Sequence, residues 1–387
     1  MQGRSPEELI QAAERAMGAR DPATALALVR QAEAAGPATE RTRMLAAAAL
    51  RATGDLTGAV NALDDVLAEQ PYHFVALLSK GAILEQAGGR GAALDVYRNA
   101  IKIAPPEDRS PPAAARQLEA ARQIVDQARH RLREHLAGSV AHLRNDLKAE
   151  DLARFDEAVD ILSGVKRAYV HEPLFFNYPR LPAIPFFDRR YFPWLEELEA
   201  AGPVIEAEMH GALKTATEAE LAPYIQYPKG APVNQWGELN HSRRWSSYFL
   251  WRDGQRQDAA CAQCPGTAEV LGRLPMCDQA GFAPTAMFSA LEAKTHIPPH
   301  TGSSNSRLLV HLPLLLPGPA RFRVGNETRE WKMGEACVFD DSIEHEAWND
   351  ADSLRVILIF DVWNPLISEA ERPLINAMLA ASNTFVP

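Results

Sequence analysis

The sequence predicts an α + β protein of two domains, with α-helical repeats over residues 1–163 and short antiparallel strands in a β-sandwich or jelly roll over 164–387. Three observations lead to this prediction. Residues 1 to about 105 are rich in Ala, Leu, Glu and Arg and repeat with a fixed period. From about residue 165, aromatic residues, prolines and short alternating apolar segments replace that pattern. At 387 residues, the chain is also too long for one ordinary compact unit.

The repeat has a period of 34 residues and shows best at three prolines, Pro37, Pro71 and Pro105. Small residues keep the same step at Ala25, Ala59 and Ala93. Small side chains let paired helices approach closely, and a proline ends the second helix of each pair. The pattern predicts one helical hairpin per period and resembles the tetratricopeptide repeat (TPR). Plain helical hairpins of no family remain an alternative, because alanine-rich helices match many templates by chance.

Residues 105–112 contain four prolines and interrupt the helical pattern, which then resumes over 113–163. We expect one long helix and one shorter helix there, capping the repeats and joining them to the second domain. Such arrays are usually rigid binding surfaces. The expected partner is a peptide or protein substrate, which the TPR-like domain would help to present.

The second domain contains several short apolar segments separated by Gly, Pro, Asn or Asp. The candidate strands are 286–293, 307–316, 320–325, 335–340 and 354–363. Many short strands at this spacing favour a β-sandwich or jelly roll over a parallel α/β sheet. Helical patterns at 190–220, 264–274 and 367–382 are expected to flank the strands.

Charge and composition exclude some classes of partner. The 50 acidic and 40 basic residues give a net charge of -10 without a long run of one sign, so neither nucleic acid nor a membrane surface is expected as a partner. The N-terminus lacks a secretory pattern, and no stretch reaches the ~18 to 20 apolar residues of a membrane span. Four cysteines are too few for a disulfide-stapled fold. We therefore expect a cytoplasmic protein.

The spacing of Cys261 and Cys264 is that of a metal knuckle or a redox pair. No second pair of this kind accompanies it, although Cys277 could supply a third ligand. A zinc site, a local disulfide or redox-sensitive loop, and ordinary thiols remain as alternatives, and ordinary thiols are favoured.

Two histidines are candidate metal ligands. His300 lies just before the strand predicted at 307–316, and His345 lies between two later strands. A jelly roll can bring such positions together at one open end of its barrel. Neutral imidazole suits Fe(II), and an oxygenase must leave coordination positions open for O2 and a co-substrate. A single histidine in such a region is more often structural, but a pair followed by an arginine favours a metal site.

The position two residues after the first histidine, where such iron sites usually place a carboxylate, is Gly302. Two interpretations follow. The site is either a two-histidine iron centre with water in the third place, or it does not bind iron.

Arg355 stands ten residues after His345 in an otherwise apolar strand. An arginine pointing inward from such a strand would be costly unless it met an anion. Its planar fork fits the distal carboxylate of 2-oxoglutarate through two parallel hydrogen bonds. The alternative is a surface arginine on the outward face of the strand.

These positions belong to a longer set of residues that resembles the aspartyl/asparaginyl β-hydroxylase family, whose members are Fe(II)- and 2-oxoglutarate-dependent oxygenases with a double-stranded β-helix (jelly-roll or cupin-like) fold. The match is dense over about 285–365 and includes His300-Thr301-Gly302, Asn305, Arg307, His311, Trp331, Phe339-Asp340-Asp341-Ser342, Glu344-His345-Glu346, Trp348, Arg355 and Asp361-Val362-Trp363. Asn234-Gln235-Trp236 extends it upstream. Animal members also carry TPR-like repeats before the oxygenase domain.

The resemblance implies roles for individual residues. His300 and His345 match the iron ligands, and Gly302 matches the family's loss of the carboxylate ligand. Arg355, with Ser289 and His311, matches the 2-oxoglutarate site. Asp341 is implied to orient the metal site from outside its ligand shell. The family also has a disulfide near Cys261 and Cys264 in an oxidising compartment.

Two positions depart from the family. In the animal enzymes, a basic residue two places before the histidine matched by His311 helps to hold the acidic side chain of the substrate. This chain has Leu309 there, and the other substrate-side position, near Met287, is also apolar. The resemblance therefore implies the iron and co-substrate chemistry of the family more strongly than it implies the family's substrate.

The predicted function is a dioxygenase that uses Fe(II), 2-oxoglutarate and O2 to hydroxylate the β-carbon of Asp or Asn in a peptide, releasing succinate and CO2. Two alternatives stay open. The substrate could be a free amino acid or small metabolite, or the chain could be a non-catalytic adaptor that acts through its repeats.

Overall fold

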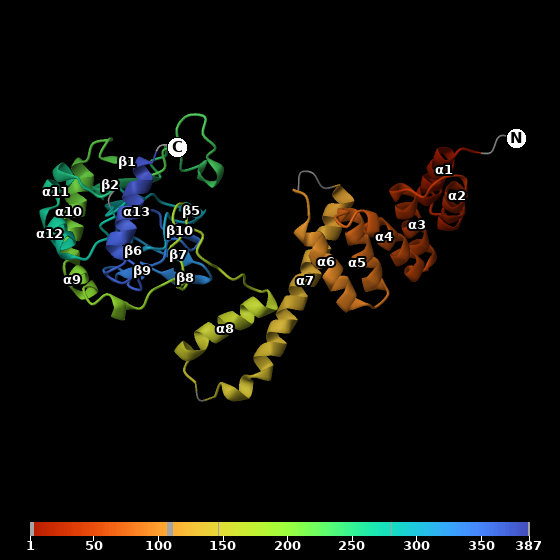
Figure 1. Cartoon of the computed structure of the whole chain (residues 1–387), viewed down its shortest axis with the longest axis horizontal. Helices are drawn as coiled ribbons and strands as arrows, with labels where there is room; N and C mark the ends of the chain where they lie inside the picture. The colour runs from red at the N-terminus through yellow and green to blue at the C-terminus, as the bar shows by residue number, and fades with distance from the viewer. Residues whose placement is uncertain (1–3, 107–110, 146, 280, 386–387) are drawn as a thin grey trace. The chain divides into compact units, whose positions relative to one another are not determined.

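The computed structural model describes residues 4–106, 111–145, 147–279 and 281–385. The chain divides into two compact units, Met1–Lys166 and Arg167–Pro387. The first unit is helical and the second contains two antiparallel sheets flanked by helices (Figure 1), so the predicted α + β class is confirmed. Of the proline-rich interruption predicted at 105–112, residues 107–110 lie outside the described residues.

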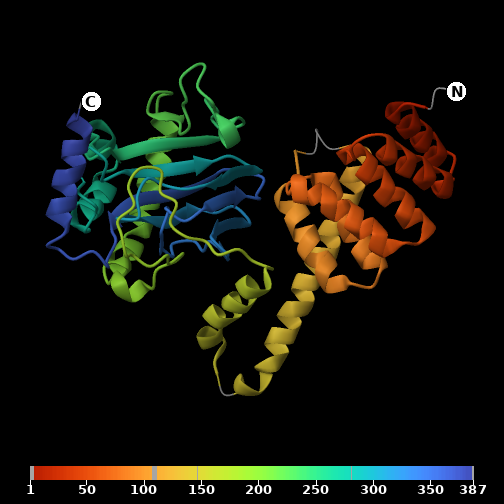
Figure 2. The same cartoon turned by 45° about the vertical axis from the view of Figure 1, so that its right-hand side comes forward.

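Three helical hairpins begin the first unit. They are α1 (Pro6–Gly18) with α2 (Pro22–Ala35), α3 (Glu40–Thr53) with α4 (Leu56–Glu69), and α5 (Phe74–Gln86) with α6 (Arg90–Lys102). Their first helices begin at Pro6, Glu40 and Phe74, which is the predicted step of 34 residues. Successive hairpins lie side by side in both views (Figures 1 and 2). The long helix α7 (Pro112–Ser139), the short 3-10 helix η2 (Ala141–Leu143) and α8 (Ala149–Ser163) follow, as predicted.

Residues that recur at the 34-residue step explain why the hairpins share one structure. Ala25, Ala59 and Ala93 are buried where the helices of each pair meet. Asp21 and Asp55 cap α2 and α4, because each side chain accepts a hydrogen bond from a backbone N–H of the first turn. All three units therefore form regular hairpins.

The second unit is built on two antiparallel sheets. The larger has the strand order β1-β2-β4-β11-β6-β9, with β3 paired to β2, and the smaller has the order β5-β10-β7-β8. The strands are β1 (Leu221–Pro223), β2 (Trp245–Arg252), β3 (Gln255–Arg256), β4 (Ala286–Leu291), β5 (Thr295–His300), β6 (Arg307–Leu315), β7 (Ala320–Val324), β8 (Glu327–Glu330), β9 (Cys337–Phe339), β10 (His345–Asn349) and β11 (Arg355–Trp363).

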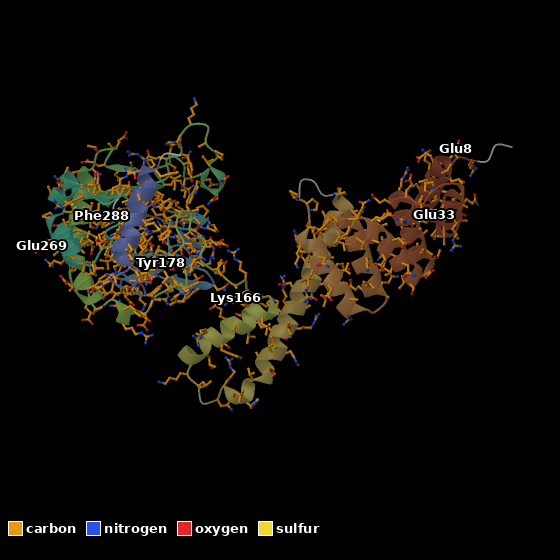
Figure 3. All side chains as sticks on the ribbon, viewed as in Figure 1. Glu8, Glu33, Lys166, Tyr178, Glu269 and Phe288 are labelled. Carbon is orange, nitrogen blue, oxygen red and sulfur yellow. The ribbon has the colours of Figure 1, made fainter. Side chains whose placement is uncertain are left out.

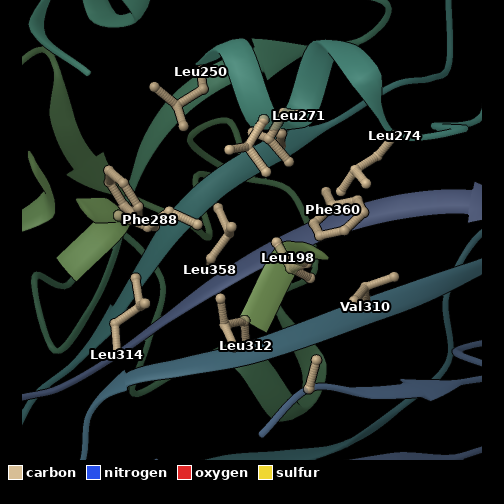
Figure 4. Packing of buried hydrophobic residues seen from close by; sticks show 14 of the residues in the cluster. Leu198, Leu250, Leu271, Leu274, Phe288, Val310, Leu312, Leu314, Leu358 and Phe360 are labelled. Carbon is tan, nitrogen blue, oxygen red and sulfur yellow. The ribbon is translucent and has the colours of Figure 1, made fainter. Parts of the chain in front are cut away.

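One face of the larger sheet packs against helices. These are α9 (Leu195–Ala200), α10 (Gly202–Thr215), α11 (Asp258–Gln263) and α12 (Pro265–Arg273), while α13 (Arg372–Thr384) packs in a separate cluster near the C-terminus. Figure 4 shows the packing, with Phe288, Leu312 and Leu358 from the strands close to Leu198 and Leu271 from the helices. Because side chains alternate along a strand, the residues between these face the smaller sheet. That second face carries the candidate site.

The strands that hold the two histidines differ from prediction. The sequence placed His300 ahead of a strand and His345 between strands, whereas His300 is the last residue of β5 and His345 the first of β10. Pro298 and Pro299 argued against β5, because proline cannot donate to a ladder. They are tolerated because β5 is an edge strand of the smaller sheet.

A search of the described residues for a long, apolar helix able to cross a membrane finds none. Side chains of both units are drawn in Figure 3, where Lys166 ends the first unit and Tyr178 and Phe288 belong to the second.

Candidate active site

The two candidate metal ligands lie next to each other. In the antiparallel pairing of β5 with β10, His345 stands directly opposite His300. Their ring centroids are 4.1 Å apart. Trp236 packs edge-on to His300, and Phe339 packs edge-on to His345. Residues far apart in the sequence are thus brought together by the register of two short strands.

Both imidazoles are held in the same tautomer. The Nδ1 atom of His300 lies 2.8 Å from the Pro298 carbonyl oxygen, and that of His345 lies 3.0 Å from the Ile343 carbonyl oxygen. A carbonyl can only accept, so each Nδ1 carries the proton and each Nε2 keeps its lone pair. Burial lowers the pKa of His300 to about 4 and the pKa of His345 well below its usual value, so both rings are neutral at pH 7. Two neutral Nε2 donors side by side are a donor set for a divalent metal.

Gly302 faces the carboxyl group of Asp341. A Cβ atom at Gly302 would lie 1.8 Å from Asp341 Oδ2, and the Gly302 N–H donates to the Asp341 carbonyl oxygen at 2.6 Å. Asp341 thus fills the space in which a side chain at position 302 would have to lie. Among the described residues, no group of three or more His, Cys, Asp and Glu side chains is arranged to hold a metal. Within the part of the chain that the structure describes, the two histidines thus stand without a third side chain arranged to hold a metal with them.

Asp341 is itself buried, and burial raises its pKa to about 7 against the opposing effect of Arg307. Its Oδ1 atom has no hydrogen-bond partner among the described residues. The neighbouring Asp340 has a structural role, because its Oδ1 accepts from the backbone N–H and the hydroxyl of Ser342 at 3.0 and 2.6 Å. The Asp340 carboxylate therefore stabilises its own turn, whereas the Asp341 carboxyl group keeps one oxygen without a hydrogen-bond partner among the described residues.

Arg355 is 1% exposed, and its Nε and Nη1 atoms have no hydrogen-bond partner among the described residues. Its guanidinium lies over the Trp331 ring, 4.5 Å from the centroid. Burial lowers its pKa to about 9. A buried cation whose donors are unused is a site for an anion.

Ser289 and His311 line the same cavity as Arg355. The Ser289 hydroxyl accepts a hydrogen bond of 3.1 Å from the Trp245 indole N–H. The Nδ1 atom of His311 is buried without a partner among the described residues, and burial, together with Arg355, lowers its pKa well below the usual value. All three residues lie on the sheet face turned away from the helices, because each alternates with a residue of the helix-side core.

A cavity of about 270 Å³, here called the inner cavity, contains all six predicted site residues in its lining. They are Ser289, His300, His311, Asp341, His345 and Arg355. A second cavity of about 520 Å³, here called the outer cavity, shares Tyr224, Met287, Leu309 and Asp341 with it. The inner cavity therefore holds Arg355 and the paired histidines, and it shares part of its lining with a larger cavity.

An ion pair between β6 and β11 at the cavities had no predicted role. Arg307 of β6 binds Asp361 of β11 through a short contact, and both lie on the cavity-facing side of the larger sheet. Burial raises the pKa of Asp361 to about 6 despite this arginine. Arg307 shares a strand face with His311 and Asp361 shares one with Arg355, because residues two apart along a strand point the same way. Their pairing does not follow from this pattern, since it depends on how β6 and β11 are aligned.

The four cysteines are free. Cys261 and Cys264 are buried in the helix-side core, and burial raises the pKa of both thiols, that of Cys264 to about 12. In the structure, both are free thiols within the apolar core.

The two antiparallel sheets thus bring two neutral histidines and a buried arginine with unpartnered N–H groups to the lining of one cavity. A family model described as Aspartyl/Asparaginyl beta-hydroxylase matches residues 200–365, which include every residue of the site. An ornithine lipid ester-linked acyl 2-hydroxylase of Rhizobium tropici is 34% identical over 202 residues, covering 51% of this chain and 67% of that protein. The human aspartyl/asparaginyl beta-hydroxylase is 37% identical over 182 residues, covering 46% of this chain and 24% of the human protein.

The chain belongs to the aspartyl/asparaginyl beta-hydroxylase family, and it is a hydroxylase-type enzyme as the sequence predicted. It spans about two thirds of the Rhizobium protein but only about a quarter of the human one. Solved structures match weakly, among them the Sgt2 TPR domain from Aspergillus fumigatus, with a TM-score of 0.28 and 21% identity over 32% of this chain and 82% of that one.

Proposed function

We propose that this chain is an Fe(II)- and 2-oxoglutarate-dependent hydroxylase whose iron is held by His300 and His345. The observation that carries the proposal is the pair of neutral, tautomer-fixed imidazoles lying 4.1 Å apart. Imidazole nitrogen suits Fe(II), and a centre with few protein ligands keeps positions open. Bound iron, with 2-oxoglutarate and O2, supplies the oxidising chemistry that replaces a C–H bond by C–OH.

We propose Arg355 as the partner of the distal carboxylate of 2-oxoglutarate. The guanidinium is buried and lines the inner cavity with its Nε and Nη1 atoms unpartnered, so a carboxylate bound there would accept from the guanidinium and balance its charge. The Ser289 hydroxyl and the His311 ring border the same end of the cavity and would complete the cradle. Trp331 holds the guanidinium plane by stacking against it.

We assign Asp341 an orienting role beside the metal. Its carboxyl group lies against Gly302, in the space from which a third protein ligand would otherwise approach. Its unpartnered oxygen is able to accept a hydrogen bond from a group bound next to the histidines.

We propose the β-carbon of Asp or Asn in a peptide as the position hydroxylated. The family description and the human relative support this target. The outer cavity shares lining residues with the cavity that the histidines line, and its about 520 Å³ offers room for residues on either side of the reacting one. We further propose that the TPR-like unit binds the peptide or protein that carries this residue, because stacked hairpins usually form docking surfaces. The free thiols support a location in the reducing cytoplasm.

The test is a coupled measurement on the purified full chain with Fe(II), ascorbate, 2-oxoglutarate and O2. An Asp- or Asn-containing peptide should raise the rate of succinate formation and should gain the mass of one oxygen on that residue. His345→Ala should abolish both signals, while His296→Ala, a change at an exposed histidine of the same strand pair, should leave them intact. Succinate formation that no peptide stimulates, or a product oxidised elsewhere, would contradict the proposed target.

A further inference from the structure

The segment 171–176, here called the strap, is hydrogen-bonded to two turns of the candidate site. The Glu172 N–H donates to the Ser342 carbonyl oxygen at 2.8 Å, and the Leu174 N–H donates to the Gly302 carbonyl oxygen at 2.9 Å. One of these turns follows the first candidate metal ligand in the sequence, and the other precedes the second. The strap therefore joins the two turns that enter and leave the paired histidines.

The strap also supplies side chains to both cavities. Leu174 lines the inner cavity, and Phe175 and Phe176 line the outer one. Phe175 stacks on Phe282, another residue of the outer cavity, with ring centroids 5.0 Å apart. All of the strap lies before residues 200–365, the part of the chain that the family model matches. The walls of the site therefore extend beyond the matched part.

The side chain of His171 binds the turn that precedes the second histidine. Its Nε2 atom lies 3.2 Å from the Leu181 carbonyl oxygen, and its Nδ1 atom lies 2.9 Å from Ser342 Oγ and 3.2 Å from Asp340 Oδ2. Because the Ser342 hydroxyl already donates to Asp340 Oδ1, Nδ1 is the donor here and both ring nitrogens carry protons. Burial opposes this charged form, but Asp340 raises the pKa of His171 above its usual value.

Asp340 depends on this contact for its charge balance. Its side chain is fully buried, and among the described residues no Lys, Arg or other His side chain forms an ion pair with it. A buried carboxylate that loses its cation is strongly destabilised, so the turn would have to rearrange if the imidazole were removed. Asp341 is the next residue of this turn and lies against Gly302, so the rearrangement would displace its carboxyl group.

We infer that the strap positions the metal centre, with His171 as the positioning residue that fixes the turn carrying Asp341. The inference rests on the proposed function, because it gives the strap a task at the centre formed by His300 and His345. His171 acts through the turn and does not bind the metal. Removing a group that orients a metal site from outside its ligands typically weakens metal binding about 10- to 100-fold.

The first test measures metal binding by the full chain. Mn(II) is titrated in the presence of 2-oxoglutarate and followed by electron paramagnetic resonance. His171→Ala should raise the apparent Kd for Mn(II) about tenfold or more. His171→Asn keeps an N–H donor next to Asp340 and should recover most of this loss. His210→Ala, the matched control at an exposed histidine of α10, should bind Mn(II) like the native chain.

Binding by His171→Ala that equals that of the native chain overturns the inference, and so does an Asn variant that binds as weakly as the Ala variant. A second measurement, hydrogen–deuterium exchange of the metal-free full chain, does not depend on the metal. In His171→Ala, exchange should be faster at 301–305 and 340–344 and should keep its native rate in the rest of the second unit.

Exchange that becomes faster throughout the second unit would show a general loss of stability and would also overturn the inference. The proposed function has a separate failure. If the native chain binds no Mn(II), the proposed metal centre is wrong, and the exchange pattern alone then decides whether the strap holds the two turns in place.

Discussion

At the residue scale, Gly302 shapes the metal centre that we propose. The Asp341 carboxyl group occupies the space where a side chain at Gly302 would lie, so the residues allowed at these two positions depend on each other. A carboxylate from position 341 therefore lies where the side chain of residue 302 would be, and residue 302 is the position that usually supplies a carboxylate ligand in such iron sites. This arrangement makes two predictions.

Gly302→Ala should destabilise the chain by about 1–3 kcal/mol, because the added Cβ would overlap Asp341. The cost should be much smaller in an Asp341→Gly background, where the overlapping atoms are gone. Urea unfolding of the four proteins in this double-mutant cycle measures the coupling. An equal cost in both backgrounds would show that the overlap does not explain the glycine.

Asp341→Asn should stabilise the metal-free protein at neutral pH and impair hydroxylation. Burial raises the folded-state pKa of Asp341 to about 7 from an ordinary 3.8, so the folded chain holds a proton that the unfolded chain has released. The penalty from this carboxyl is therefore absent below about pH 4, grows as pH rises, and is complete above about pH 7. The stability gained by the Asn variant should grow over the same window, which denaturant unfolding at several pH values measures. A gain that shrinks as pH rises would contradict this.

At the scale of elements, close packing of the hairpins depends on small residues. A Cβ at Gly81 of α5 would lie 2.4 Å from the Tyr97 ring of α6, while one at Gly91 of α6 would meet nothing within 4 Å. Gly81→Ala should therefore lower stability by about 1–3 kcal/mol through overpacking. Gly91→Ala, the matched control, should be neutral or stabilising by up to about 1 kcal/mol. Thermal unfolding distinguishes the two, and similar melting temperatures would be inconsistent with this packing.

The sequence predicted β4, β6, β7, β9 and β11 from their short apolar or alternating segments. It did not predict β2, β5 or β10. β5 was missed because it contains two prolines, and β10 because its alternation involves His, Glu and Asn. The 34-residue period, by contrast, predicted the hairpins because each unit repeats the same packing.

The site shows a similar division. The apolar neighbours of Arg355 in the sequence favoured an inward side chain, and the positions of the two histidines around the predicted strands favoured a metal site. No pattern in the sequence gives the register that sets His345 opposite His300, because register depends on pairing between distant strands. The Arg307–Asp361 pair was hidden for the same reason, since each partner is an ordinary charged residue until β6 and β11 are aligned.

At the scale of the whole molecule, the two compact units should respond separately to changes made in one of them. We expect Mn(II) with 2-oxoglutarate to bind only the second unit. The two ligands should therefore raise the temperature of one calorimetric transition and leave that of the other unchanged. Gly81→Ala should lower the temperature of the transition that the ligands leave unchanged. A single transition shifted by both changes would contradict independent unfolding of the units.

The central claim is that two histidines and one arginine bind iron and a dicarboxylate together, and anaerobic titration with Fe(II) and 2-oxoglutarate tests it most directly. Chelation of iron by the keto acid gives a weak visible absorption band. The native chain should develop this band, His300→Ala and His345→Ala should lose it, and Arg355→Ala should require much more 2-oxoglutarate to reach it. A native chain without the band, or histidine variants that retain it at full strength, would contradict the account.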